Sequence, residues 1–147
     1  MKKFAALGLA ALFAAPAALA EPSGSWLSEV QQVYKQAMQE KDPGARQAEL
    51  FQGSAKVGET KTHQIQLTAG KYYTFFAACD HDCNNIDLTL LRDGRTLIAD
   101  TDPHASPMFG WYARQSGQYT LTLTMPNCID RVCDYSIQVF EGSQKIL

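Results

Sequence analysis

The sequence lacks two features that would connect it with nucleic acid or with a membrane. It has no basic stripe, and its 13 lysines and arginines are outnumbered by 15 aspartates and glutamates, for a formal net charge of −2. This balance argues against binding to nucleic acid or to anionic lipid. The apolar stretch at residues 4–15 is shorter than the roughly 20 residues that cross a bilayer. We therefore expect no membrane insertion of the mature chain.

The sequence also lacks the local motifs of common enzymes. It contains no G-x-S-x-G segment and no glycine-rich phosphate loop. His63, His81 and His104 are scattered and show no metal-site or triad spacing. These absences disfavour catalysis. Because distant residues can converge in a fold, a hydrolase with an unrecognised site remains an alternative.

Residues 1–20 have the pattern of an export signal. Lys2 and Lys3 supply the positive start, residues 4–15 the apolar core, and Ala18-Leu19-Ala20 the cleavage signal. The residue directly after the predicted cleavage point is Glu21 and not a cysteine, which argues against a lipid anchor. Removal of this segment, which holds two lysines, leaves 127 residues with 11 basic and 15 acidic side chains, a net charge of −4. We expect one domain in the periplasm or outside the cell.

The four cysteines all lie in the predicted mature chain. They are Cys79, Cys83, Cys128 and Cys133. In an oxidising compartment an even number indicates two disulfides. Sequence alone allows three pairings, and we favour Cys79 with Cys83 and Cys128 with Cys133 because each pair brackets a short loop at a strand end. A four-thiolate zinc site is the alternative, although such sites prefer tighter C-x2-C spacings.

The part of the mature chain before residue 59 is predicted to be helical and then irregular. Apolar residues recur at helical spacing up to Lys41, namely Trp26, Val30, Val33 and Ala37 with Leu27, Tyr34 and Met38 alongside. The Asp-Pro-Gly segment that follows ends the helix. Residues 45–51 form a weak second helical pattern, and residues 52–58 are interpreted as a polar connector. The amphipathic helix either packs against the rest of the domain or binds a partner. Residues 21–58 are thus a helical segment and linker.

Residues 59–141 change to a period of two, which predicts strands. Turn signals stand at Ala69-Gly70, Asp93-Gly94 and Ser116-Gly117. About seven strands without helices between them predict a mainly β chain folded as an antiparallel β-sandwich. Residues 142–147 form a polar tail. The expected strands cover residues 62–67, 72–78, 86–92, 96–99, 109–114, 118–125 and 135–139.

Four segments in this order resemble the bacterial pre-peptidase C-terminal (PPC) domain family. They are residues 67–73 (LTAGKYY), 87–91 (DLTLL), 116–121 (SGQYTL) and 135–139 (YSIQV). The resemblance runs from about Lys61 to Phe140 and implies a jelly-roll-like sandwich, usually an appendage of secreted peptidases that aids binding, secretion or targeting. Because no peptidase precedes this segment, we expect that role not to apply unchanged.

A second resemblance concerns one turn and the general layout. Ser116, Gly117 and Tyr119 are similar to the start of a late strand in periplasmic inhibitors of g-type lysozymes, which are also small exported sandwiches. This similarity implies an inhibitor of a lysozyme or peptidase as an alternative function. It also implies that Ser116 and Tyr119 contact the partner.

Oxygen-bearing side chains crowd the loop between the first two cysteines and the strand that follows. The candidate ligands are Asp80, Asp82, Asn84 and Asp87, joined by Asp100 and Asp102 from a neighbouring loop. Oxygen ligands of this type suit calcium, and some members of the resembled family bind it. An EF-hand is excluded, since its sixth position is Asn85 and its twelfth is Leu91. The alternative is that these residues form turns with their own backbone.

Three aromatic residues stand beside a proline-containing loop. Phe109, Trp111 and Tyr112 could stack on a sugar or fill a cleft of a partner, with packing in the core as the alternative. Together these patterns predict an exported, non-enzymatic module that binds a protein or a glycan.

Overall fold

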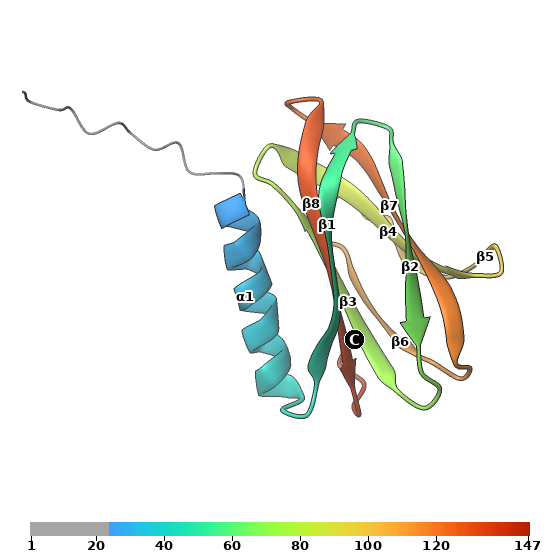
Figure 1. The fold of residues 1–147 in the computed structure, drawn as a ribbon. Helices are drawn as coiled ribbons and strands as arrows, with labels where there is room; N and C mark the ends of the chain where they lie inside the picture. The colour runs from blue at the N-terminus through green and yellow to red at the C-terminus, as the bar shows by residue number, and fades with distance from the viewer. Residues whose placement is uncertain (1–23) are drawn as a thin grey trace, which may run out of the picture.

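The computed structural model describes residues 24–147, so the predicted signal peptide lies outside the described residues. One helix precedes eight strands (Figure 1). The elements are α1 (Gly24–Lys41), β1 (Arg46–Lys56), β2 (Thr60–Leu67), β3 (Tyr72–Cys79), β4 (Cys83–Arg92), β5 (Arg95–Asp100), β6 (Met108–Tyr112), β7 (Gly117–Cys128) and β8 (Val132–Gly142).

The strands form two four-stranded sheets that face each other. One sheet has the order β1-β8-β3-β6 and the other β2-β7-β4-β5, and every neighbouring pair is antiparallel. Alternate side chains of each strand point between the sheets, as in β4, where Ile86, Leu88 and Leu90 are fully buried. Burial of these side chains stabilises the two layers. The predicted mainly β sandwich preceded by one helix is confirmed.

Strand β1 corrects the predicted boundary of the sandwich. The short helix at residues 45–51 and the connector at 52–58 are both wrong, because Arg46–Lys56 pairs with β8 along its length. Gly53 resembled a linker residue in the sequence. In the fold the ring of Tyr135 lies across it, and a Cβ there would stand 3.0 Å from the Tyr135 hydroxyl. The sheet therefore begins at Arg46, well before residue 59.

Helix α1 packs on the outer face of the sheet that contains β8 and β3 (Figure 1). Met38 joins Phe76 and Phe140 in a second apolar cluster, and the Tyr34 ring stacks on Phe76 with centroids 4.4 Å apart. Of the predicted apolar positions of the helix, Leu27 and Met38 are buried, whereas Trp26 is 46 % and Val33 64 % exposed. Within residues 24–147, no helix is long and apolar enough to span a membrane.

Candidate functional site

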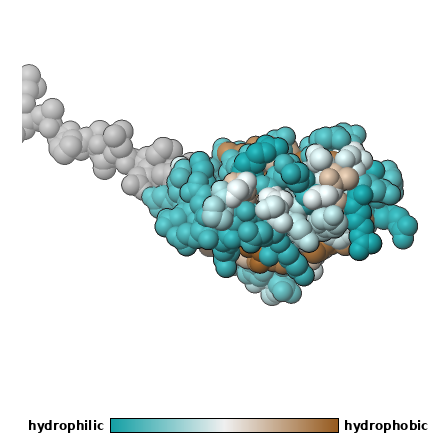
Figure 2. Space-filling view, turned by 90° about the horizontal axis from the view of Figure 1, so that it is seen from below, coloured by the Kyte–Doolittle hydropathy of each residue, from teal (hydrophilic) through white to brown (hydrophobic). Residues whose placement is uncertain are grey.

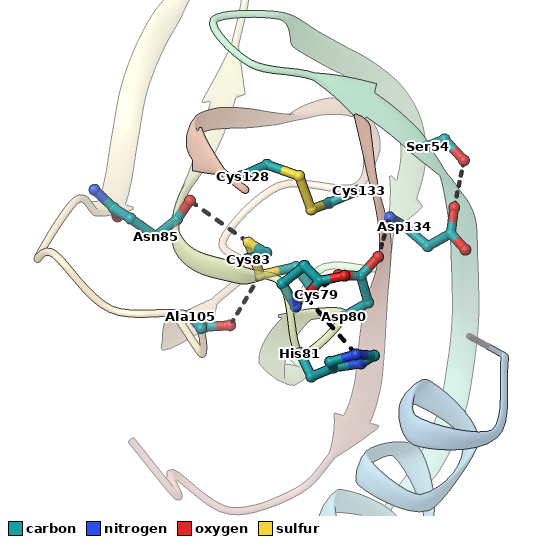
Figure 3. Close-up of a disulfide and its surroundings, with 11 residues drawn as sticks. Ser54, Cys79, Asp80, His81, Cys83, Asn85, Ala105, Cys128, Cys133 and Asp134 are labelled. Carbon is teal, nitrogen blue, oxygen red and sulfur yellow. Dashed lines mark hydrogen bonds and ion pairs between the residues drawn. A yellow bond between two sulfur atoms is a disulfide. The ribbon is translucent and has the colours of Figure 1, made fainter. Parts of the chain in front are cut away.

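Two disulfides hold one end of the sandwich. They join Cys79 to Cys83 and Cys128 to Cys133 (Figure 3), as predicted. Cys83 lies opposite Cys128 in the ladder between β4 and β7, so the two bridged loops are neighbours. All four cysteines are oxidised, and the zinc alternative is therefore wrong.

Asp80 shapes the first of these loops. It is buried, and its carboxylate accepts hydrogen bonds from the amide of Asp82 at 3.0 Å and from the amide of Asp134 at 2.9 Å (Figure 3). Asp134 in turn accepts a hydrogen bond from the Ser54 hydroxyl. Asp80 thus ties β3 to β8 through the backbone, which is the turn-forming role given above as the alternative to metal binding.

The six predicted calcium ligands do not form one site. Asp82 is hydrogen-bonded to Asp130, and this contact raises the pKa of the Asp130 carboxyl. Among the residues that the structure describes, one group of His, Cys, Asp or Glu side chains lies close enough together to share a metal ion. It consists of Asp100, Asp102 and His104. Calcium takes six to eight oxygen ligands. The structure does not gather the six predicted residues into one group, and calcium binding stays a prediction.

Both ring nitrogens of His104 contact other groups of the same loop. The amide of Ser106 donates to His104 Nδ1 at 3.2 Å, so the neutral ring carries its proton on Nε2, which faces Asp100 at 3.4 Å. Asp100 also accepts hydrogen bonds from the amides of Asp102 and Met108. The cluster closes the loop between β5 and β6. Beside it, burial and the Asp100 charge raise the pKa of Asp87.

The predicted aromatic platform separates into buried and exposed members. Phe109 is 5 % exposed, and its ring lies 5.1 Å from that of Phe75 in the core. Tyr119 is also buried. Both side chains are thus largely packed inside the protein, and their contact with a ligand stays a prediction. Tyr112 is 42 % exposed, and its ring lies 4.7 Å from that of Tyr72.

Two adjoining hollows flank Tyr112, near the end of the sandwich where β6 leads into β7. The larger has a volume of about 490 Å³ and the smaller about 280 Å³, and Trp111 and Tyr112 line both. We call the larger hollow the aromatic groove. Its lining residues are Arg92, Leu97, Trp111, Tyr112, Arg114, Gln115 and Tyr119.

Tyr119 and Arg92 fix the loop that forms one wall of the aromatic groove. The Tyr119 hydroxyl donates to the Gln115 carbonyl at 2.6 Å and accepts from Arg92 Nη1 at 2.8 Å. Arg92 also donates to the carbonyls of Gln115 and Ser116, each at 3.3 Å. Gly117 has a φ of 146°, and a Cβ there would lie 3.1 Å from Arg92 Nη2. The Ser-Gly-x-Tyr segment thus has a structural role.

Ser116 completes this loop. Its hydroxyl accepts a hydrogen bond from the Ala69 amide at 2.8 Å, which joins the turn before β3 to the turn before β7. Arg114 lies beside it and is exposed, without a hydrogen bond or ion pair to any residue in the described part of the chain. Sequence reasoning missed Arg92 and Arg114, because no local pattern links them with the aromatic residues.

The second disulfide loop exposes aliphatic side chains. Ile129 is 76 % exposed at its tip, with Val132 and Val57 also exposed beside it. The Val57 amide donates to the Arg131 carbonyl at 3.0 Å, and the Ile129 amide donates to the Asp82 carbonyl at 2.9 Å. We call Val57, Ile129 and Val132 the aliphatic tip. Sequence reasoning missed it, because this loop was interpreted only through its cysteines.

No protein-family model and no curated protein matches this sequence. The resemblance to the PPC domain family therefore stays a prediction. Among solved structures, the chain is similar to a periplasmic inhibitor of g-type lysozyme from Aeromonas hydrophila, with 14 % identity over 67 % of this chain and 86 % of that one and a TM-score of 0.49. It is also similar to a CBM4 structure, with 17 % identity over 67 % and 74 % of the two chains and a TM-score of 0.26. Neither match assigns a function or a site.

A further hollow of about 480 Å³ lies between α1 and the β1–β8 pair. Its lining includes Gln31, Gln52 and Ser54 with Asp134, whose carboxylate is engaged by Ser54. Its one aromatic residue, Tyr135, is buried. This hollow offers neither an exposed ring nor an unpaired charge, and the aromatic groove is the better candidate site.

Proposed function

We propose that the protein is an exported, non-enzymatic binding module that holds a glycan against Tyr112. The observation that carries this proposal is the position of the Tyr112 ring, exposed between two hollows and lying beside the tilted ring of Tyr72. An exposed aromatic face suits the apolar C–H face of a sugar, while polar groups at the rim suit its hydroxyls.

The size of the hollows favours a small ligand over a large protein surface. At about 490 and 280 Å³ they are close to the range of small-molecule sites, roughly 300–1,000 Å³. A stable protein interface buries about 1,200–2,000 Å² in total. Figure 2 shows that hydrophilic residues cover most of the lower end of the molecule and that hydrophobic ones are confined to small areas.

Export is supported by the disulfides. Both pairs need an oxidising compartment, which indicates a location outside the cytoplasm. Together with the export pattern of residues 1–20, this supports a protein of the periplasm or the exterior.

Replacing Tyr112 with alanine is expected to weaken glycan binding about tenfold or more, because the stacking face is removed. Trp26 and Trp111 are the two tryptophans, so Trp26→Phe leaves Trp111 as a single fluorescent reporter in the groove. Cellotetraose, chitotetraose and tetragalacturonate are titrated into this protein with and without Tyr112→Ala. A dissociation constant in the micromolar to millimolar range corresponds to about 4–8 kcal/mol.

The matched control is Val33→Ala, which removes an exposed apolar side chain from α1 and should leave binding unchanged. If none of the three sugars alters Trp111 fluorescence or releases heat in calorimetry, the proposal is wrong. It is equally wrong if Tyr112→Ala binds as tightly as the parent.

A second candidate function is inhibition of an envelope lysozyme through the aliphatic tip. The observation that favours it is Ile129, an exposed anchor on a loop held rigid by a disulfide. Rigid apolar anchors often dominate protein interfaces, because little side-chain entropy is lost on binding.

This candidate predicts that the protein slows cell-wall lysis by a g-type lysozyme and that Ile129→Ser lowers the inhibition at least tenfold. The substitution should leave the unfolding free energy within about 0.5 kcal/mol, since the side chain is exposed. The measurement is a turbidity assay with the parent, Ile129→Ser and Tyr112→Ala. Equal lysis with and without the parent protein would exclude inhibition of that enzyme.

A further inference from the structure

The aromatic groove carries positive charge on a protein that is acidic as a whole. Its lining includes Arg92 and Arg114 and no aspartate or glutamate, although the chain has a formal net charge of −2. A concave surface lined by charges of one sign attracts a ligand group of the opposite sign. The groove is therefore suited to an anionic group.

The two arginines differ in what they can offer. Arg92 already donates to two carbonyls and to the Tyr119 hydroxyl, and its guanidinium lies 4.7 Å from the centre of the Tyr119 ring. It positions the loop and contributes its charge. Arg114 is exposed and keeps its five N–H donors unused by the described residues. Arg114 is thus available to a ligand.

Several polar groups around the Tyr112 ring make no hydrogen bond with the described residues, and most of them are hydrogen-bond donors. The guanidinium of Arg114 presents paired N–H donors that can bind both oxygens of a carboxylate at once. The Tyr112 hydroxyl and the Gln115 side-chain amide make no hydrogen bond with the described residues. Acceptor groups on a ligand would satisfy this lining better than donors would.

We infer that the groove takes a carboxylate-bearing glycan, such as a short chain of uronic acids, with Arg114 paired to a sugar carboxylate. The inference rests on the proposed glycan binding and names the class of glycan. The Tyr112 ring supports one sugar face, and the smaller hollow on its other side accommodates a neighbouring sugar. No covalent step is involved.

A comparison of tetragalacturonate with its fully methyl-esterified form tests the role of the carboxylate charge, because the sugar backbone is the same in both. Calorimetry and Trp111 fluorescence in the Trp26→Phe protein should show the acid binding about tenfold tighter than the ester, the range of a charge-assisted bidentate pair. Arg114→Ala should remove this preference, and Arg114→Lys should keep part of it. Sodium chloride at about 0.5 M should weaken binding of the acid alone.

The matched control is Arg46→Ala on β1, at the opposite edge of the sheet from β6, which should keep the preference. Equal binding of acid and ester, with both weakened by Tyr112→Ala, would overturn this inference and leave the proposed function standing. A preference that survives Arg114→Ala would overturn it as well. No response to either sugar, nor to the neutral tetrasaccharides, would overturn both proposals.

Discussion

Phe109→Ala is expected to lower the free energy of unfolding by about 3–5 kcal/mol, the usual cost of removing a buried phenylalanine. The ring is 5 % exposed and packs against Phe75 between the sheets, so its loss leaves a cavity that neighbouring strands fill only in part. Urea denaturation followed by circular dichroism measures the change. With a slope of about 1–3 kcal/mol per molar urea, the midpoint should fall by about 2 M.

Tyr112→Ala, three residues along the same strand, is the matched control. Its side chain is 42 % exposed, so we expect a loss of about 1 kcal/mol or less. The pair separates a structural role from a binding role on one edge strand. A Phe109→Ala protein that unfolds like the parent but no longer binds sugar would show that Phe109 contacts the ligand, contrary to its burial.

Asp42→Ala is expected to cost about 2–4 kcal/mol. Asp42 is 2 % exposed, and its carboxylate accepts hydrogen bonds from the amides of Gly44 at 3.3 Å and Ser143 at 3.0 Å. Alanine would leave both amides without this acceptor, and hydrogen bonds to a charged group contribute about 1.5–3 kcal/mol each. The effect should appear as a lower urea midpoint with an unchanged slope.

The bond to Ser143 joins the end of α1 to the end of β8, and Gly142 makes room for it. A Cβ at Gly142 would overlap Asp42 Oδ2. The matched control is Glu40→Ala, two residues earlier on the exposed face of the same helix, which should change stability by about 0.5 kcal/mol or less. An Asp42→Ala protein as stable as the Glu40→Ala protein would contradict this account.

The aromatic residues show how far a local pattern can place a site. Period-two alternation put Phe109 and Trp111 on one face of a strand and Tyr112 on the other. It did not reveal that the face of Phe109 lies inside, because an edge strand such as β6 has one neighbouring strand and a short apolar pattern. The position of the opposing sheet decided which ring reaches solvent.

The acidic loop shows the same limit for metal ligands. Spacing placed Asp80, Asp82 and Asp87 close together in the chain, which suggested calcium. In the fold, the Asp80 carboxylate instead accepts hydrogen bonds from the amides of Asp82 and Asp134. Asp134 lies 54 residues away in the chain. Both Asp80 oxygens accept a backbone hydrogen bond, and one of the two donors is on a strand that spacing along the chain does not indicate.

The sequence by itself determined the two-layer β architecture and the preceding helix, and it favoured, among three possible cysteine pairings, the one that the fold contains. Each of these follows from short-range features, namely alternation along a strand, helical spacing and sequence separations of 4 and 5 between the bonded cysteines. Only the tertiary structure decided that Arg46–Lys56 is a strand, that Gly53 lies under Tyr135, and that Arg92 and Tyr119 build one wall of the groove. These features depend on contacts between residues that are 27 or more positions apart. No local pattern specifies them, because they form only when strands distant in the chain become neighbours in one sheet.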